Sequence, residues 1–278
     1  NKLIKPTERK PAKIAVLIIS PQKFSNANPI EKRWALGKKV WEQYMNKIPN
    51  IDCFFIRCTP YKLNDKTSVW IEGNTIFVAN PWTKQTGQDA ILLKTIKAIE
   101  FLIKNKNYSH FIRTNINTFF KVKNLNDYCE IHHNSFFSTP TWQNEWYTVG
   151  YSIFFTSDVA SHIVKEYKRL NALNEKLIDP YHSDDCAITA LATGIWPLSK
   201  PNPFRCCPNL KPGVKQLFCN RSLKENFTTY GMLMTKLNSL KQAINIVEKK
   251  SGSNVIYFRT RDGLNIDDIR LFYSGELR

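Results

Sequence analysis

The stretch His110–Phe120, HFIRTNINTFF, decides the fold class predicted for this chain. Its first residues are aromatic and β-branched, which is typical of a buried strand. A polar run from Thr114 to Thr118 follows, and the chain then becomes apolar again. In α/β proteins, ligands bind at the carboxyl ends of the strands. We therefore predict that a strand ending in Asn115-Ile116-Asn117 forms the floor of a ligand site.

Strands and helices are predicted to alternate on both sides of this stretch. Gly73-Asn74 between two β-branched segments predicts a hairpin, Ser157-Asp158 predicts a helix cap, and Gly194 predicts a helix end. The alternation indicates one α/β domain with decorations. The other predicted strands are 14–19, 52–58, 69–71, 75–78, 135–138, 151–155, 195–198 and 255–259, and the predicted helices are 29–44, 88–104, 159–170, 186–193, 230–250 and 266–272.

These elements divide the chain of 278 residues into three parts. Residues 1–12 are basic and rich in proline, and we expect a flexible lead-in. Residues 13–200 are predicted to form the core domain. Residues 201–278 are predicted to form a C-terminal extension of helix and strand that packs on the same domain.

No apolar run approaches the length that spans a bilayer, so the chain as given is expected to be soluble. It begins with Asn1. That start fits a cytoplasmic protein and equally a lumenal domain of the secretory pathway whose targeting segment has been removed.

The net charge of +17 favours an anionic partner, such as nucleic acid, an acidic membrane surface or a phosphorylated substrate. Compositional bias is an equal explanation, because Lys, Asn and Ile are frequent together. The basic residues are spread over the whole chain and no nucleic-acid reader motif is present, so nucleic acid is not the expected partner. The sequence predicts no oligomeric state.

The seven cysteines include no Cys-x-x-Cys pair, so a zinc site is not expected. Cys206 or Cys207 could form a disulfide with Cys219 in an oxidising compartment.

Five short motifs follow one another between residues 14 and 198: Glu31-Lys32-Arg33-Trp34, Leu93-Lys94-Thr95, Arg113–Phe119, Val149–Val159 and Asp184-Asp185-Cys186. In order and spacing they resemble motifs of the β-1,3-galactosyltransferase and Fringe group of glycosyltransferases. That group has an Arg-x-x-Trp-type helix, a Leu-Lys-Thr helix, a Lys-Thr-Asp-Asp-Asp-Thr-Phe strand end, a glycine-rich strand and a Glu-Asp-Val helix start. Viral and bacterial proteins with an Arg-Thr-Asn strand end are also similar.

The resemblance implies a GT-A fold, with a Rossmann-like mixed sheet flanked by helices, and hexosyltransferase activity. The donor would be a nucleoside-diphosphate sugar, with UDP as the expected nucleotide, and the acceptor a hydroxyl of a glycan or glycoprotein, with inversion at the sugar. The alternatives are a catalytically inactive GT-A-like protein that binds a sugar or nucleotide and, more weakly, a basic nucleic-acid-binding protein.

The carboxylates Asp184 and Asp185 are the candidate catalytic residues. An inverting transfer needs a base that takes a proton from the acceptor hydroxyl. Asp185 matches the position with that role in the family, and Asp184 is its neighbour. The alternative is ordinary helix capping by Ser183 or Asp184.

The remaining site residues follow from the resemblance and have structural alternatives. The asparagines could form a polar turn, the lysines a solvated helix edge, Arg33 a salt bridge, and the aromatic residues a cover over the core. The predicted donor contacts are Ser20, Arg33, Asn80, Lys94, Lys97, Arg113, Thr114, Asn115 and Asn117, and the predicted acceptor contacts are Trp142, Trp146, Tyr147 and Gly150.

Asn80, Asn115 and Asn117 stand where the family carries acidic residues. Two carboxylates hold Mn²⁺ or Mg²⁺ against the donor diphosphate, whereas a neutral amide oxygen is a poor ligand for a hard cation. The sequence therefore argues against a metal cofactor; the candidate ligands, if one binds, are Asn115, Asn117 and His182. Lys94, Lys97 or Arg113 could supply the counter-charge for the diphosphate instead.

Overall fold

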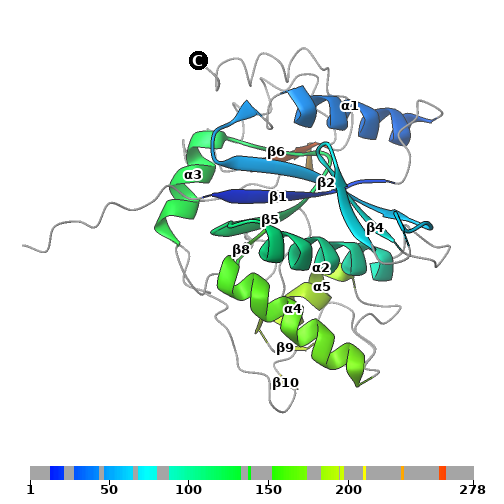
Figure 1. Cartoon of the computed structure of the whole chain (residues 1–278). Coiled ribbons are helices and arrows are strands. Elements are labelled where there is room, and N and C mark those ends of the chain that lie inside the picture. Colours follow the sequence, from blue (N-terminus) through cyan, green and yellow to red (C-terminus); the bar gives the residue numbers. More distant parts are fainter. Residues whose placement is uncertain are drawn as a thin grey trace, which may run out of the picture.

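The structure is a computed structural model that describes residues 13–21, 28–43, 47–64, 68–79, 88–132, 137–138, 152–173, 183–193, 195–196, 209–210, 233–234 and 257–260. In this part of the chain, a mixed seven-stranded sheet of order β3-β4-β2-β1-β5-β8-β7 has helices on both faces (Figure 1). Helix α1 covers one face, and α2, α4 and α5 cover the other. The fold is therefore α/β and Rossmann-like, as the sequence predicted.

The strands of this sheet are β1 (Ile14–Ile19), β2 (Ile51–Thr59), β3 (Val69–Glu72), β4 (Thr75–Ala79), β5 (His110–Asn115), β7 (Phe137–Ser138) and β8 (Ser152–Thr156). The helices are α1 (Pro29–Gln43), α2 (Gln88–Asn105), α3 (Val122–Ile131), α4 (Ser157–Ala172) and α5 (Asp184–Thr193). Two small sheets are formed by β9 (Ile195–Trp196) with β10 (Asn209–Leu210), and by β6 (Thr118–Phe120), β12 (Tyr257–Thr260) and β11 (Leu233–Met234). None of the described helices combines the length and the apolar character that crossing a bilayer requires.

The central strand β1 lies parallel to β2 on one side and to β5 on the other. Its last residue, Ile19, is level with Ile56 and with Asn115. The carboxyl ends of β1 and β5 therefore lie side by side, and α5 and the N-terminal half of α2 can place side chains over them.

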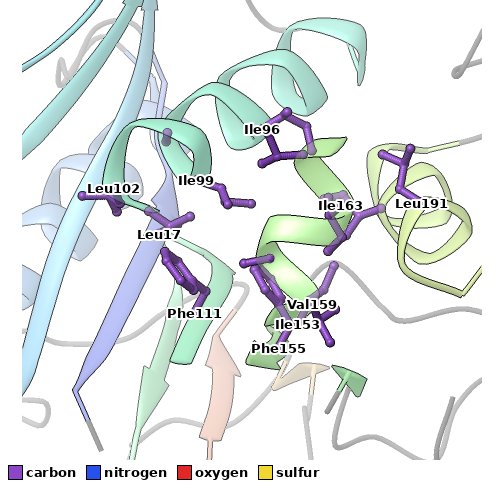
Figure 2. Close-up of a cluster of buried hydrophobic side chains, with 14 of the residues drawn as sticks. Leu17, Ile96, Ile99, Leu102, Phe111, Ile153, Phe155, Val159, Ile163 and Leu191 are labelled. Carbon is purple, nitrogen blue, oxygen red and sulfur yellow. The ribbon is translucent and has the colours of Figure 1, made fainter. Parts of the chain in front are cut away.

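The core between the sheet and its helices fixes these positions (Figure 2). Ile96, Ile99 and Leu102 recur at helical spacing and place one face of α2 against Leu17 and Phe111 of the sheet. Val159 and Ile163 of α4 and Leu191 of α5 complete the same cluster. The apolar residues that recur at helical spacing in the sequence thus form the packing face of α2.

The predicted hairpin at Gly73-Asn74 is confirmed, since β3 and β4 pair antiparallel and Gly73 has a positive φ of 57°. Two predictions were wrong. The cap of α4 is Thr156, whose backbone is extended and whose hydroxyl donates to the Asp158 carboxylate, so Ser157 and Asp158 lie in the first turn. Leu233–Met234, predicted within a helix, is a strand, because it pairs with the distant β12.

Helix α3 was not predicted from the sequence. The stretch His110–Phe120 contains a second strand, β6, in addition to β5. The flexible lead-in at 1–12, the helix at 266–272 and the possible disulfide at Cys206, Cys207 and Cys219 lie outside the described residues. Within the extension, β12 pairs antiparallel with β6.

The turn Ile116-Asn117 joins β5 to β6 and is held by α1. The Trp41 indole N–H donates to the carbonyl oxygen of Ile116 at 3.0 Å. Gly37 lies one helical turn earlier, and a Cβ built on it would approach the same oxygen to 2.7 Å. Glycine at position 37 thus lets α1 approach the turn closely.

We predict that Gly37→Ala lowers the free energy of unfolding by about 1–3 kcal/mol, because the added methyl group would push α1 away from the turn. In an uncrowded helix the same change would stabilise by about 1 kcal/mol. Urea denaturation shows whether the substitution lowers or raises the free energy of unfolding. Lys39→Ala, an exposed change on the same helix, is the control and should stay within about 0.5 kcal/mol of wild type. A more stable Gly37→Ala variant would mean that α1 does not touch the turn.

Candidate functional site at the carboxyl ends of β1 and β5

Charged and polar side chains from several elements meet where β1 and β5 end. Ser20 follows β1 directly, Arg113 and Thr114 lie near the end of β5, and Asp184 begins α5. Lys94 reaches the same place from α2. All five are buried. The structure thus brings together Lys94, the Ser20 carbonyl and Arg113, which are predicted donor contacts, with the predicted catalytic carboxylate Asp184. Thr114 follows Arg113 in the strand and points to the opposite face of the sheet.

The strongest contact in this group is a buried ion pair. A terminal nitrogen of Arg113 donates to Oδ2 of Asp184, and the side chains are 3% and 6% exposed. The two residues are 71 positions apart, so the pair fastens the end of β5 to the start of α5. Asp184 also lies in the first helical turn, where the helix dipole favours a negative charge.

Lys94 is the second buried cation of the group. Its Nζ donates to the backbone carbonyl of Ser20 at 2.9 Å. Burial lowers the pKa of Lys94 to about 8; the Cys58 thiol and the Asp184 carboxylate oppose this shift, while Arg113 and Arg57 add to it. Lys94 is thus a cation held in an unfavourable environment.

Asp185 is half-buried and lies at the edge of the group. Its Oδ1 accepts hydrogen bonds from the Ser183 hydroxyl and from the Cys186 backbone N–H, the latter at 3.0 Å. This local bonding is that of a helix start, as the capping alternative expected. Asp185 is nevertheless the more exposed of the two carboxylates, since Asp184 is buried against Arg113.

Asn115 and Asn117 are half-buried on either side of Ile116, at the end of β5 and in the turn. Lys97, in contrast, lies in a different network. Its Nζ is 3.6 Å from Glu100, which also pairs with Lys104 and with Lys168 of α4. We therefore leave Lys97 out of the candidate site.

Several predicted site residues lie outside the described part of the chain. Arg33 is in α1, but its side chain is among the parts not described. The others are Asn80, Trp142, Trp146, Tyr147, Gly150 and His182.

The described side chains do not fit a Mn²⁺ or Mg²⁺ ion. Among them, no three His, Cys, Asp or Glu residues are grouped as metal ligands. At the expected position Asn115 and Asn117 offer neutral amides, and the neighbouring Lys94 and Arg113 would repel a cation.

Arg57 was missed in the sequence. It lies near the end of β2, and its guanidinium is 5.5 Å from the centre of the Phe77 ring. It is close enough to Lys94 to lower the pKa of that group. The available signal was a lone cation near the end of an otherwise largely apolar strand, the same pattern as Arg113 in β5.

No family model matches the chain, and no curated protein matches it. The proposals below therefore rest on the fold, the geometry of this site and the resemblance of the sequence motifs.

We predict that Asp184→Asn lowers the free energy of unfolding by about 3–5 kcal/mol, because it removes the carboxylate that pairs with buried Arg113. The double variant Arg113→Met/Asp184→Leu should recover most of this loss, since it buries neither charge. Urea denaturation of the single and double variants measures both effects. Asp185→Asn is the control and should cost less than about 1.5 kcal/mol, the scale of one hydrogen bond. Equal losses for the two asparagine variants would contradict the ion pair.

The lowered pKa of Lys94 predicts how stability depends on pH. Below pH 8 the ammonium is charged in both states and its burial opposes folding; near the unfolded pKa of about 10.4 both states become neutral and the penalty disappears. Relative to Lys94→Met, wild type should therefore gain about 1–3 kcal/mol as pH rises from 7 to 10. The other titrating groups are the same in both proteins, so their contributions to the unfolding free energy cancel in the difference. A constant difference in unfolding free energy across this range would contradict the prediction.

Proposed function

We propose that this chain is a glycosyltransferase with a GT-A fold. It transfers a sugar from a nucleoside diphosphate, with UDP as the expected nucleotide, to a hydroxyl of a glycan or glycoprotein, with inversion at the sugar carbon. The observation that carries the proposal is the Arg113–Asp184 ion pair. It joins two of the five motifs that carry the resemblance to the β-1,3-galactosyltransferase and Fringe group.

The position of these motifs supports the proposal independently of the resemblance. The Asn115-Ile116-Asn117 segment and the start of α5 lie at the carboxyl ends of parallel strands, where α/β proteins bind their ligands. Lys94 and Arg113 give this edge a positive charge that suits a diphosphate.

The proposed reaction is a single displacement. The acceptor hydroxyl attacks the anomeric carbon from the face opposite the nucleotide. The new carbon–oxygen bond forms as the bond to the diphosphate breaks, and the nucleoside diphosphate leaves with that electron pair. Asp185 takes the proton of the hydroxyl. Asp184 is less suited to this role because its carboxylate is buried and bound to Arg113.

A second candidate is a protein of the same fold that binds a nucleotide sugar without turning it over. The amide side chains of Asn115 and Asn117, in place of the acidic motif, favour this candidate. A thermal-shift screen of nucleotide sugars, with and without Mn²⁺, identifies the donor under either candidate, because a bound ligand raises the melting temperature. Transfer from that donor to an acceptor separates the two.

We predict that Asp185→Asn lowers the rate of transfer by about 10²–10⁴-fold, the usual contribution of a general base, while donor affinity stays within about threefold. The measurements are sugar transfer and release of the nucleoside diphosphate, together with titration of the donor.

Asp158→Asn is a matched control for this experiment. Asp158 is also the second residue of its helix and also accepts a hydrogen bond from a hydroxyl two residues earlier. It lies at the opposite end of β5, since Thr156 is level with His110. Its transfer rate should be that of wild type. Unchanged transfer in Asp185→Asn, or an equal loss in both variants, would exclude Asp185 as the base.

A further inference from the structure

Two buried cations, Lys94 and Arg113, lie at this edge of the sheet. Asp184 is the carboxylate among the electrostatic neighbours of Lys94 in the described part of the chain, and the half-buried Arg57 of β2 adds a further positive charge within electrostatic range. The Asp184 carboxylate is bound to Arg113. A buried cation is costly unless an opposite charge accompanies it, so the group favours an anion.

The Lys94 ammonium has hydrogen-bonding capacity beyond its bond to Ser20. An ammonium has three N–H donors. Among the described residues, the carbonyl of Ser20 is the acceptor that Lys94 Nζ contacts, at 2.9 Å. That bond fixes the ammonium at the end of β1 and leaves two donors for a ligand.

The groups that face Lys94 explain why it is sensitive to an anion. Cys58 faces it from β2, Arg113 from β5 and Asp184 from α5, while β1 contributes the neutral Ser20 carbonyl. Arg57, next to Cys58 in β2, lies on the other face of the sheet beside Phe77 and acts on Lys94 through its charge. Burial and the two arginines lower the pKa of Lys94 to about 8. Phosphate oxygens near Nζ would offset these effects and keep the ammonium charged.

We propose that Lys94 binds the diphosphate of the donor as a fixed cation, in place of a metal ion. The identity of the ligand as a nucleoside diphosphate rests on the proposed function; the anion site itself rests on the charges. The amides at Asn115 and Asn117 fit this arrangement, because carboxylates there would compete with the diphosphate for Lys94.

The test is calorimetric titration of the full chain with inorganic pyrophosphate at pH 7 in the presence of a chelator. Wild type should bind without metal, and Lys94→Met should bind at least tenfold more weakly. Lys104→Met removes an exposed lysine from the same helix and should stay within twofold of wild type. Binding that requires Mn²⁺, or equal affinity in wild type and Lys94→Met, would overturn the proposal.

A second measurement needs no variant and therefore does not depend on how well Lys94→Met folds. The affinity of wild type for pyrophosphate should fall at least threefold between pH 7 and pH 9, as Lys94 loses its charge. Pyrophosphate itself becomes more negative over this range, so its own titration acts in the opposite direction. An affinity that is constant or rises would count against Lys94 as the binding cation.

Sugar transfer in the presence of chelator separates this inference from the proposed function. Pyrophosphate binding that depends on Lys94, with no transfer from any nucleotide sugar, would support the anion site and contradict the proposed glycosyltransferase activity. Transfer that stops when a chelator is added would support the proposed glycosyltransferase activity and contradict diphosphate binding without a metal ion.

Discussion

The ion pair between Arg113 and Asp184 is the contact on which the candidate site depends. It joins the strand that decides the fold to a helix that begins 71 residues later, and both side chains are nearly fully buried. Transferring two charges from water into a protein costs several kcal/mol per ion, and such pairs often add little net stability. We interpret this pair as a positioning contact: it fixes where α5 begins relative to the end of β5, and so where Asp185 lies.

Much of the sheet could be predicted because its signals are local. The apolar run Ile14–Ile19 is the central strand and is buried up to its last residue, and the spacing of Ile96, Ile99 and Leu102 gives the packing face of α2. Helix α3 was harder to predict. Leu125, Tyr128 and Cys129 have helical spacing, but Lys121 at its N-cap makes no side-chain capping bond, so the usual start signal is missing. Leu233–Met234 could not be predicted because its structure depends on pairing with β12.

Some residues of the candidate site were predicted from the sequence, but their contacts were not. Lys94 and Lys97 both border the apolar face of α2, and periodicity alone does not say which is buried. The difference comes from neighbours distant in the sequence: Lys94 meets the Ser20 carbonyl, whereas Lys97 meets Glu100 near the surface shared with α4. The pairing of Arg113 with Asp184 is equally non-local. Arg57 was overlooked because its effect on Lys94 depends on how α2 lies against β2, which is not local in the sequence.

The buried cations Lys94 and Arg113 and the amides at positions 115 and 117 both disfavour a bound metal ion. With carboxylates at positions 115 and 117, a divalent cation would bridge them to the donor, but Lys94 and Arg113 would then oppose that cation through a medium of low dielectric constant. With amides there, no cation is held in place to be repelled, and the buried cations can face the proposed diphosphate directly. A metal ion and a buried lysine are thus alternative ways to offset the negative charge of the proposed diphosphate, and the residues around the end of β5 favour the lysine. A lysine buried at a cost to stability fits a group that is kept for binding a ligand and not for the fold.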